Sequence, residues 1–151
     1  MSSKIKLFYE TYNDPEISKF IENYNIIRLK GIIRFVQNEN YSDPFKAILD
    51  TGAHISLIPQ YMWKSLIIEN LGKYEVRGIS NKPECNIPSI IGRLEIIIQD
   101  RIGNSTKKLK IHSCLALTNE IPLILGFKDL LSKFKIYFHY DKNEAYIETK
   151  N

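Results

Sequence analysis

An apolar segment that ends in the tetrapeptide Asp50-Thr51-Gly52-Ala53 constrains the fold of this 151-residue chain more than any other feature. Residues 45–49 (FKAIL) are typical of a buried strand, and residues 55–58 (ISLI) resume an extended apolar run. Gly52 allows a sharp turn and lets backbone N–H groups approach the Asp50 carboxylate with no Cβ in the way. Thr51 adds a hydroxyl for a local hydrogen-bond network. We therefore expect Asp50 to lie on a turn between two buried strands, which is a rigid support for a charged group.

A second apolar segment, residues 121–126 (IPLILG), ends in Gly126. It is followed by residues 127–134 (FKDLLSKF), whose spacing predicts a short helix. An aspartate in a glycine turn after a strand is by itself a common structural arrangement. The two segments together are more informative than either one alone.

These segments resemble the retropepsin-like, single-lobe aspartic peptidases. The matching pieces are residues 47–59 (AILDTGAHISLIP) and residues 123–131 (LILGFKDLL). The resemblance implies an all-β fold: a closed, β-barrel-like acid-protease lobe with one or two short helices and a flap hairpin. It covers about residues 26–148. We therefore divide the chain into an N-terminal extension with a short helix, residues 1–25, and a retropepsin-like peptidase domain, residues 26–151.

The resemblance also implies roles for the residues of the turn. Asp50 would be the catalytic carboxylate, with Thr51 and Gly52 completing the catalytic turn and Thr51 locking two such turns together across a dimer axis. Aspartic proteases are the standard example of two neighbouring carboxylates that share one proton, so that one acts as a base on water and the other as an acid. The tetrapeptide occurs only once here. The implied protein is therefore a homodimeric endopeptidase that acts on polypeptides and needs no cofactor and no metal.

Substrate contacts would come from the catalytic turn and from the flap. Residues 74–79 (YEVRGI) predict one strand and residues 87–98 its return, with a turn over residues 80–84. By resemblance this hairpin is the flap, and an ordinary surface hairpin is the alternative. The implied substrate-binding residues are Ala53, His54, Gly78, Ile79, Ser80 and Asn81. His54 would line the cleft or tune Asp50, or it would be a packed or solvent-facing histidine.

Two positions depart from the retroviral pattern. Retroviral members usually pair an acidic residue, four positions after the catalytic aspartate, with an arginine directly after the second glycine. Here these positions hold His54 and Phe127, so we expect a differently built contact between subunits. The same departures support an alternative function, a catalytically silent module that binds peptides or proteins.

Two short helices are predicted outside these motifs. Residues 14–24 begin with Asp-Pro, which is typical of an N-cap and a first helical position. Ile17, Phe20 and Ile21 would form the apolar stripe of that helix. Residues 59–68 would form the second helix, after the catalytic strand.

Composition fits one compact domain. The apolar fraction of 44% and the charged fraction of 25% are ordinary for a globular protein. Cys85 and Cys114 make neither a disulfide framework nor a metal-binding spacing.

The chain has no signal-peptide or membrane-spanning run, so we expect a cytoplasmic protein without membrane contact. The net charge of +4 is spread along the chain, and the densest cluster, residues 107–110 (KKLK), favours a solvated turn over a nucleic-acid site.

Overall fold

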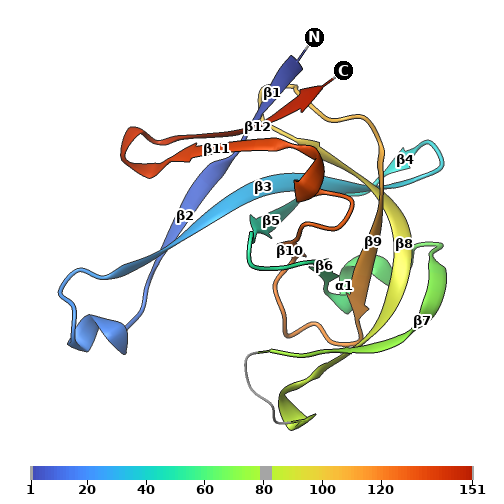
Figure 1. The fold of residues 1–151 in the computed structure, drawn as a ribbon, viewed down its shortest axis with the longest axis horizontal. Coiled ribbons are helices and arrows are strands. Elements are labelled where there is room, and N and C mark those ends of the chain that lie inside the picture. Colours follow the sequence, from blue (N-terminus) through green and yellow to red (C-terminus); the bar gives the residue numbers. More distant parts are fainter. Residues whose placement is uncertain (1, 79–82, 151) are drawn as a thin grey trace.

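The computed structural model describes residues 2–78 and 83–150, and β-strands dominate it (Figure 1). The strands are β1 (Ser2–Lys6), β2 (Phe8–Asn13), β3 (Asn25–Gln37), β4 (Asn40–Tyr41), β5 (Phe45–Leu49), β6 (Ser56–Ile58), β7 (Glu69–Val76), β8 (Ile87–Gln99), β9 (Leu109–Ala116), β10 (Ile124–Leu125), β11 (Lys135–His139) and β12 (Glu144–Lys150). The helical elements of these ranges are α1 (Gln60–Trp63) and the 3₁₀ turns Ile17–Lys19, Pro83–Cys85, Leu131–Lys133 and Tyr140–Lys142. The predicted all-β fold class is confirmed.

Six strands close into a barrel. One part of β3 pairs antiparallel with β5, and another part pairs antiparallel with β8. From β5 the pairing continues through β10, β6 and β9 to β8, and the pairing of β8 with β3 closes the circuit. The long strands β3 and β8 extend beyond this circuit, where β3 pairs with β2 and β8 pairs with β7. Because the sheet closes on itself, the strands that carry the core have partners on both sides.

The interior of the barrel holds the main hydrophobic core. Ile33, Phe35 and Ile96 are at most 1% exposed, and residues two apart on a strand face the same side. Ile5 and Ile147, from the first and last strands, belong to the same core and are both 0% exposed. The two ends of the chain therefore help to build the core to which β5 and β6 also contribute.

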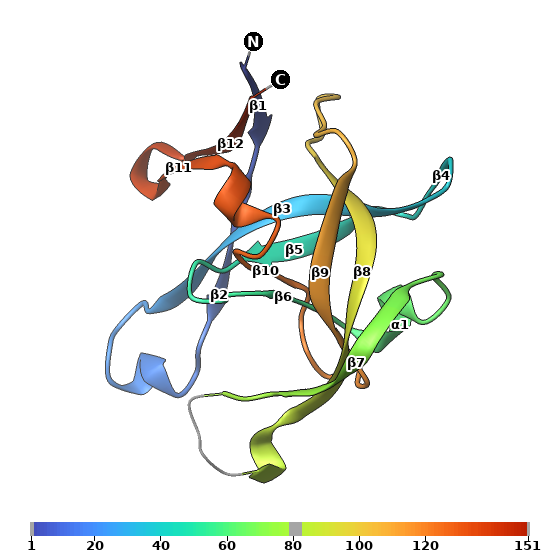
Figure 2. The same ribbon diagram turned by 45° about the vertical axis from the view of Figure 1, so that its right-hand side comes forward.

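A second sheet joins the two ends of the chain. β12 lies between β1 and β11 and pairs antiparallel with both (Figures 1 and 2). Ser2 is opposite Lys150 in this sheet, so the termini lie side by side. Residues 2–13 thus contribute strands to both sheets, and the division of the chain after residue 25 stays a prediction.

The region from residue 14 to residue 24 forms less helix than its sequence predicts. It contains the single 3₁₀ turn Ile17–Lys19, although Asp14 Oδ1 accepts hydrogen bonds from two backbone N–H groups of the turn, at 3.0 and 3.2 Å, as an N-cap does. The apolar stripe does not stabilise a longer helix because Phe20 and Ile21 are exposed. A short helix that buries no apolar face is marginal in water.

The other two predicted helices are also reduced. Residues 59–68 contain the one-turn α1, which is anchored where Trp63 Nε1 donates a hydrogen bond to Ala116 O at 2.9 Å. Residues 127–134 contain the 3₁₀ turn Leu131–Lys133. Within residues 2–78 and 83–150, no helix has the length and apolar character needed to cross a bilayer.

Candidate active site

Asp50 follows β5 at a point where three strands lie side by side. β10 lies between β5, its parallel neighbour, and β6, its antiparallel neighbour. Leu125 is opposite Leu49, and Ile124 is opposite both Ile48 and Leu57. Residues 50–55 therefore form an arch over β10, with one end in each neighbouring strand. The predicted turn between buried strands is observed, with a third strand between them.

Backbone hydrogen bonds hold Asp50 in this arch. Asp50 N donates to Leu125 O at 3.0 Å, and Ala53 N donates to Asp50 O at 3.1 Å. The carboxylate oxygen Oδ1 accepts a hydrogen bond from Gly52 N at 2.8 Å. No group of the described residues donates to Oδ2. Asp50 is half-buried and lines the surface, so its carboxyl group can be reached by water or by a second carboxylate.

Gly126 supports the arch from the side of β10. Its N–H donates to Ser56 Oγ at 3.0 Å. A Cβ at this position would lie 2.6 Å from the carbonyl carbon of Ile55 and 2.8 Å from Ala53 O. Only a glycine allows the two segments to approach this closely, which is the physical reason for the glycine that ends the second apolar segment.

Main-chain hydrogen bonds join the arch to the segment that follows Gly126, at the place where retroviral peptidases carry a salt bridge. Phe127 N donates to Ala53 O, and Lys128 N donates to His54 O, both at 3.0 Å. The side chains of His54 and Phe127 are exposed. The chain after Gly126 is thus tied to the arch through backbone groups.

Asp129 ties the same segment to the barrel. Its Oδ2 accepts a hydrogen bond from His112 N at 2.9 Å and lies 2.6 Å from His112 Nδ1. Burial acts to raise the pKa of the Asp129 carboxyl, but the hydrogen bonds from His112 outweigh burial and lower the pKa below its ordinary value. The sequence analysis missed this pair, because a strand residue and a turn residue 17 positions apart share no local pattern.

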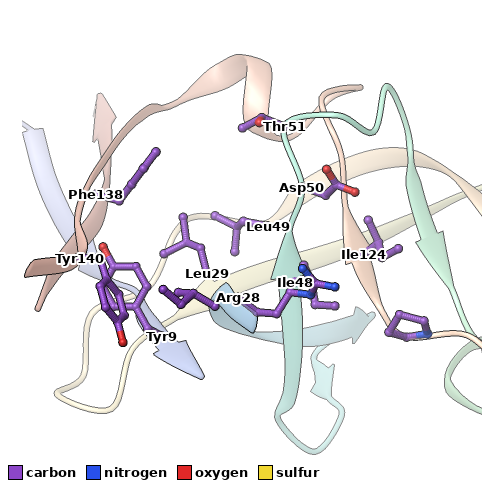
Figure 3. Close-up of a pocket in the computed structure, with 12 residues that line it drawn as sticks. Tyr9, Arg28, Leu29, Ile48, Leu49, Asp50, Thr51, Ile124, Phe138 and Tyr140 are labelled. Carbon is purple, nitrogen blue, oxygen red and sulfur yellow. The ribbon is translucent and has the colours of Figure 1, made fainter. Parts of the chain in front are cut away.

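Asp50 borders two hollows in the surface. The first extends from Asp50 and Thr51, past Leu29, to the aromatic side chains of Phe138 and Tyr140 (Figure 3). The sequence analysis did not assign Leu29 or Tyr140 to the site, since nothing in their local sequence relates them to the turn. This hollow brings the start of β3 and the end of β11 next to Asp50.

The second hollow lies between the arch and the end of β7. It collects five of the predicted site residues, and Thr51 lines the first hollow instead. The five are Asp50, Gly52, Ala53, His54 and Gly78. Its other walls are largely apolar and include Leu57, Val76 and Cys114. Burial raises the pKa of the Cys114 thiol, so this thiol is uncharged at neutral pH, and Arg77 adds a charged group to the lining.

Three predicted substrate-binding residues, Ile79, Ser80 and Asn81, lie outside the described residues. Within the described part of the chain, no group of three or more His, Cys, Asp or Glu side chains is placed to hold a metal ion.

The closed barrel, the arch over β10 and the adjoining hairpin define a retropepsin-like lobe. Over 99% of its length, the chain is similar to the crystal structure of a retropepsin-like aspartic protease from Rickettsia conorii, with 17% sequence identity, a TM-score of 0.53 and 94% of that chain covered. No family model and no curated protein matches the sequence. At this identity the likeness establishes the fold, and it includes the N-terminal strands, which the sequence resemblance did not cover.

Proposed function

We propose that this chain is an aspartic endopeptidase that acts as a homodimer and hydrolyses peptide bonds in extended polypeptides. The observation that carries the proposal is the arch, which holds Asp50 on backbone groups and leaves its carboxyl group reachable from the surface. One carboxylate is half of an acid–base pair. A second copy of the chain supplies the other half by two-fold symmetry.

In the proposed dimer the two Asp50 carboxyl groups share one proton, because two carboxylates at close range cannot both ionise. The ionised group takes a proton from a water molecule, whose oxygen attacks the carbonyl carbon of the substrate. The protonated group gives its proton to the carbonyl oxygen. The tetrahedral intermediate then breaks its C–N bond as the amine nitrogen takes a proton from the carboxyl group that had accepted one from water. The other carboxylate takes a proton back from a hydroxyl of the intermediate, so that the pair again holds one proton. Thr51 would hold the two arches together, and Gly52 would orient each carboxylate.

The second hollow would receive substrate side chains. Its walls are largely apolar, so we expect hydrophobic residues beside the cleaved bond. Ala53, His54 and Gly78 would contact an extended substrate, which fits the edge of a hairpin as an added strand. Ile79, Ser80 and Asn81 would belong to a flap that covers the substrate and excludes water.

Cleavage of an unfolded protein between pH 3 and pH 9 tests the proposal directly. We expect wild type to cleave and Asp50→Asn, which keeps the shape of the side chain, to lose activity completely. Asp43→Asn, an exposed carboxyl change away from the arch, serves as the control and should cleave like wild type. Activity should decline towards alkaline pH because the pair needs one proton, and full activity at pH 9 would contradict a shared-proton mechanism.

A mixing experiment tests whether the site is composite. Adding an equal amount of Asp50→Asn to a fixed amount of wild type should reduce activity to about half, because freely exchanging subunits form mixed dimers with one carboxylate. A monomeric enzyme would keep its full activity in the same mixture.

The alternative function is a catalytically silent module that binds peptides in the second hollow. The positions of His54 and Phe127, which lack the retroviral salt bridge, favour this alternative. A folded, dimeric wild type that binds unfolded polypeptides and never cleaves them would support the module and overturn the peptidase.

A further inference from the structure

We propose that the hairpin of β2 and the first half of β3, residues 8–30, is an arm that packs on a second copy of the chain, with Phe20 and Ile21 as its anchors. This contact presupposes the homodimer proposed above. It assigns that dimer a contact surface outside the catalytic turns.

The outer part of the arm contributes nothing to the core of its own protomer. Within residues 11–28 no residue is buried, and both views show the hairpin projecting away from the barrel (Figures 1 and 2). At its tip Phe20 is 88% exposed and Ile21 is 53% exposed. Tyr12 and Ile27, further back, are also exposed. A two-stranded hairpin gains stability when it packs against another surface, so this apolar tip is suited to contact a partner.

The arm is nevertheless ordered by its own contacts. Asn13 Nδ2 donates hydrogen bonds to Ser18 Oγ at 3.2 Å and to Tyr24 O at 3.4 Å, across the tip. At the root, Tyr9 Oη donates to Glu144 O at 2.7 Å. An arm that is already ordered loses less conformational entropy when it binds, which favours its use as a contact surface.

The root of the arm borders the surface at which a second Asp50 must arrive. Ile27, Arg28 and Leu29 line the first hollow together with Asp50 and Thr51 (Figure 3). The second hollow, on the other side of Asp50, is the proposed substrate site. If the second hollow takes the substrate, the first hollow is the side of Asp50 that is left for the other copy, and two-fold symmetry repeats this contact on both copies. Each arm starts at the rim of that contact and therefore reaches over the partner.

Charge favours the same occupant. The tip carries Asp14, Glu16 and Glu22 against Lys19, whereas the whole chain has a net charge of +4. An acidic tip is attracted to the net positive surface of another copy, over a range of about 8 Å in physiological salt. An anionic membrane or a nucleic acid would repel the same tip.

Sedimentation of the full chain over a range of concentrations tests the arm. The double variant Phe20→Ser with Ile21→Ser should raise the dimer dissociation constant by about tenfold or more, because two apolar anchors no longer become buried. Ile67→Ser is the matched control, since Ile67 is 81% exposed and lies outside the arm. The control should leave the dissociation constant unchanged. A double variant that dimerises as tightly as wild type overturns the arm and leaves the proposed dimeric peptidase standing.

A cross-linking experiment gives a second, independent result. A photoreactive benzophenone amino acid at position 20, in place of Phe20, should produce a cross-linked species of twice the chain mass without any added substrate. A parallel sample contains an unfolded polypeptide. Cross-linking to that polypeptide and never between chains, or no cross-linking in a dimeric sample, would overturn the proposal. A wild type that is monomeric at every concentration would overturn both the arm and the dimeric peptidase.

Discussion

Gly126 and Asp129 hold the Asp50 arch in place, although neither belongs to the turn that carries the carboxylate. Gly126 lets β10 approach the arch closely, and Asp129 fastens the following segment to His112 on β9. The position of Asp50 therefore depends on side chains, or their absence, far along the sequence. Two substitutions probe this dependence without touching the carboxylate.

Gly126→Ala should destabilise the fold by about 3 kcal/mol, because the added methyl group overlaps backbone atoms of the arch that cannot move independently. Urea unfolding at a fixed protein concentration, followed by the fluorescence of the single tryptophan Trp63, measures the loss. Gly78→Ala is the control for stability, because a Cβ there meets no atom within 4 Å. Equal stability of the two variants would show that the backbone of the arch can shift to accept the added methyl group at little cost.

Asp129→Asn should cost about 1–3 kcal/mol at neutral pH, because it removes the charged acceptor of two hydrogen bonds from His112. Asparagine tolerates the positive φ of 60° at this position, so the backbone is not strained. Folding lowers the pKa of Asp129 below its ordinary value of 3.8. The extra unfolding free energy of wild type over Asp129→Asn is therefore complete above that value, and it disappears as the pH falls through the lower pKa of the folded state.

Unfolding free energies of wild type and Asp129→Asn between pH 2 and pH 7 test this dependence. The two curves should lie apart near neutrality and converge at the acidic end. A difference in unfolding free energy that stays constant over the whole pH range would mean that the charge of the Asp129 carboxylate does not stabilise the segment after Gly126.

At the scale of elements, alternation and apolar runs predicted the strands, and tertiary contacts decided the helices. The pattern of residues 45–58 identified β5, the arch and β6, because the apolar residues of each strand are the ones that become buried. The helical pattern around Phe20 was misleading, because Phe20 and Ile21 pack on no apolar surface. Residues 127–134 bury Leu130 and Leu131 in the core, but the positive φ of Asp129 and the non-helical backbone of Leu130 limit the helix to the turn Leu131–Lys133. The barrel closure, the His112–Asp129 contact and the arm join residues that are distant in sequence, and no local pattern encodes such pairs.

The root of the arm provides a prediction at this scale. Hydrogen bonds from Lys30, and then from Lys46, hold the pKa of Glu10 at about 2, below its ordinary value of 4.5. Carbon-detected NMR should show the Glu10 carboxylate protonating only near that acidic value. Lys30→Met should return the pKa of Glu10 towards 4.5, since it removes the main hydrogen-bond donor. A wild-type Glu10 that already titrates near 4.5 would mean that the ion pairs at the arm root do not persist in solution.

At the scale of the whole molecule, the first and last strands complete the core instead of lying outside it. β1 pairs along its full length with residues 146–150 of β12, and each strand contributes a fully buried isoleucine, Ile5 and Ile147. A barrel whose core is closed by both ends of the chain needs both ends in order to fold.

Ile5→Ala should therefore cost about 2–5 kcal/mol, as expected for a fully buried aliphatic side chain. Ile102→Ala is the matched control, since Ile102 is 66% exposed, and it should change stability little. Thermal or urea unfolding at one protein concentration compares them. If both variants were equally stable, the N-terminal strands would be a dispensable extension of the lobe.

The position of β10 between β5 and β6 has a consequence for when the site can form during protein synthesis. Residues 45–58 leave the ribosome long before residues 124–126, so a nascent chain carries Asp50 without the strand on which both ends of its arch rest. Contacts between such distant segments form late, after loop closure has been achieved. The carboxylate can therefore take its working position only when most of the chain has been made. In the proposed peptidase, a partly made chain would then be inactive towards its own exposed segments and towards its neighbours.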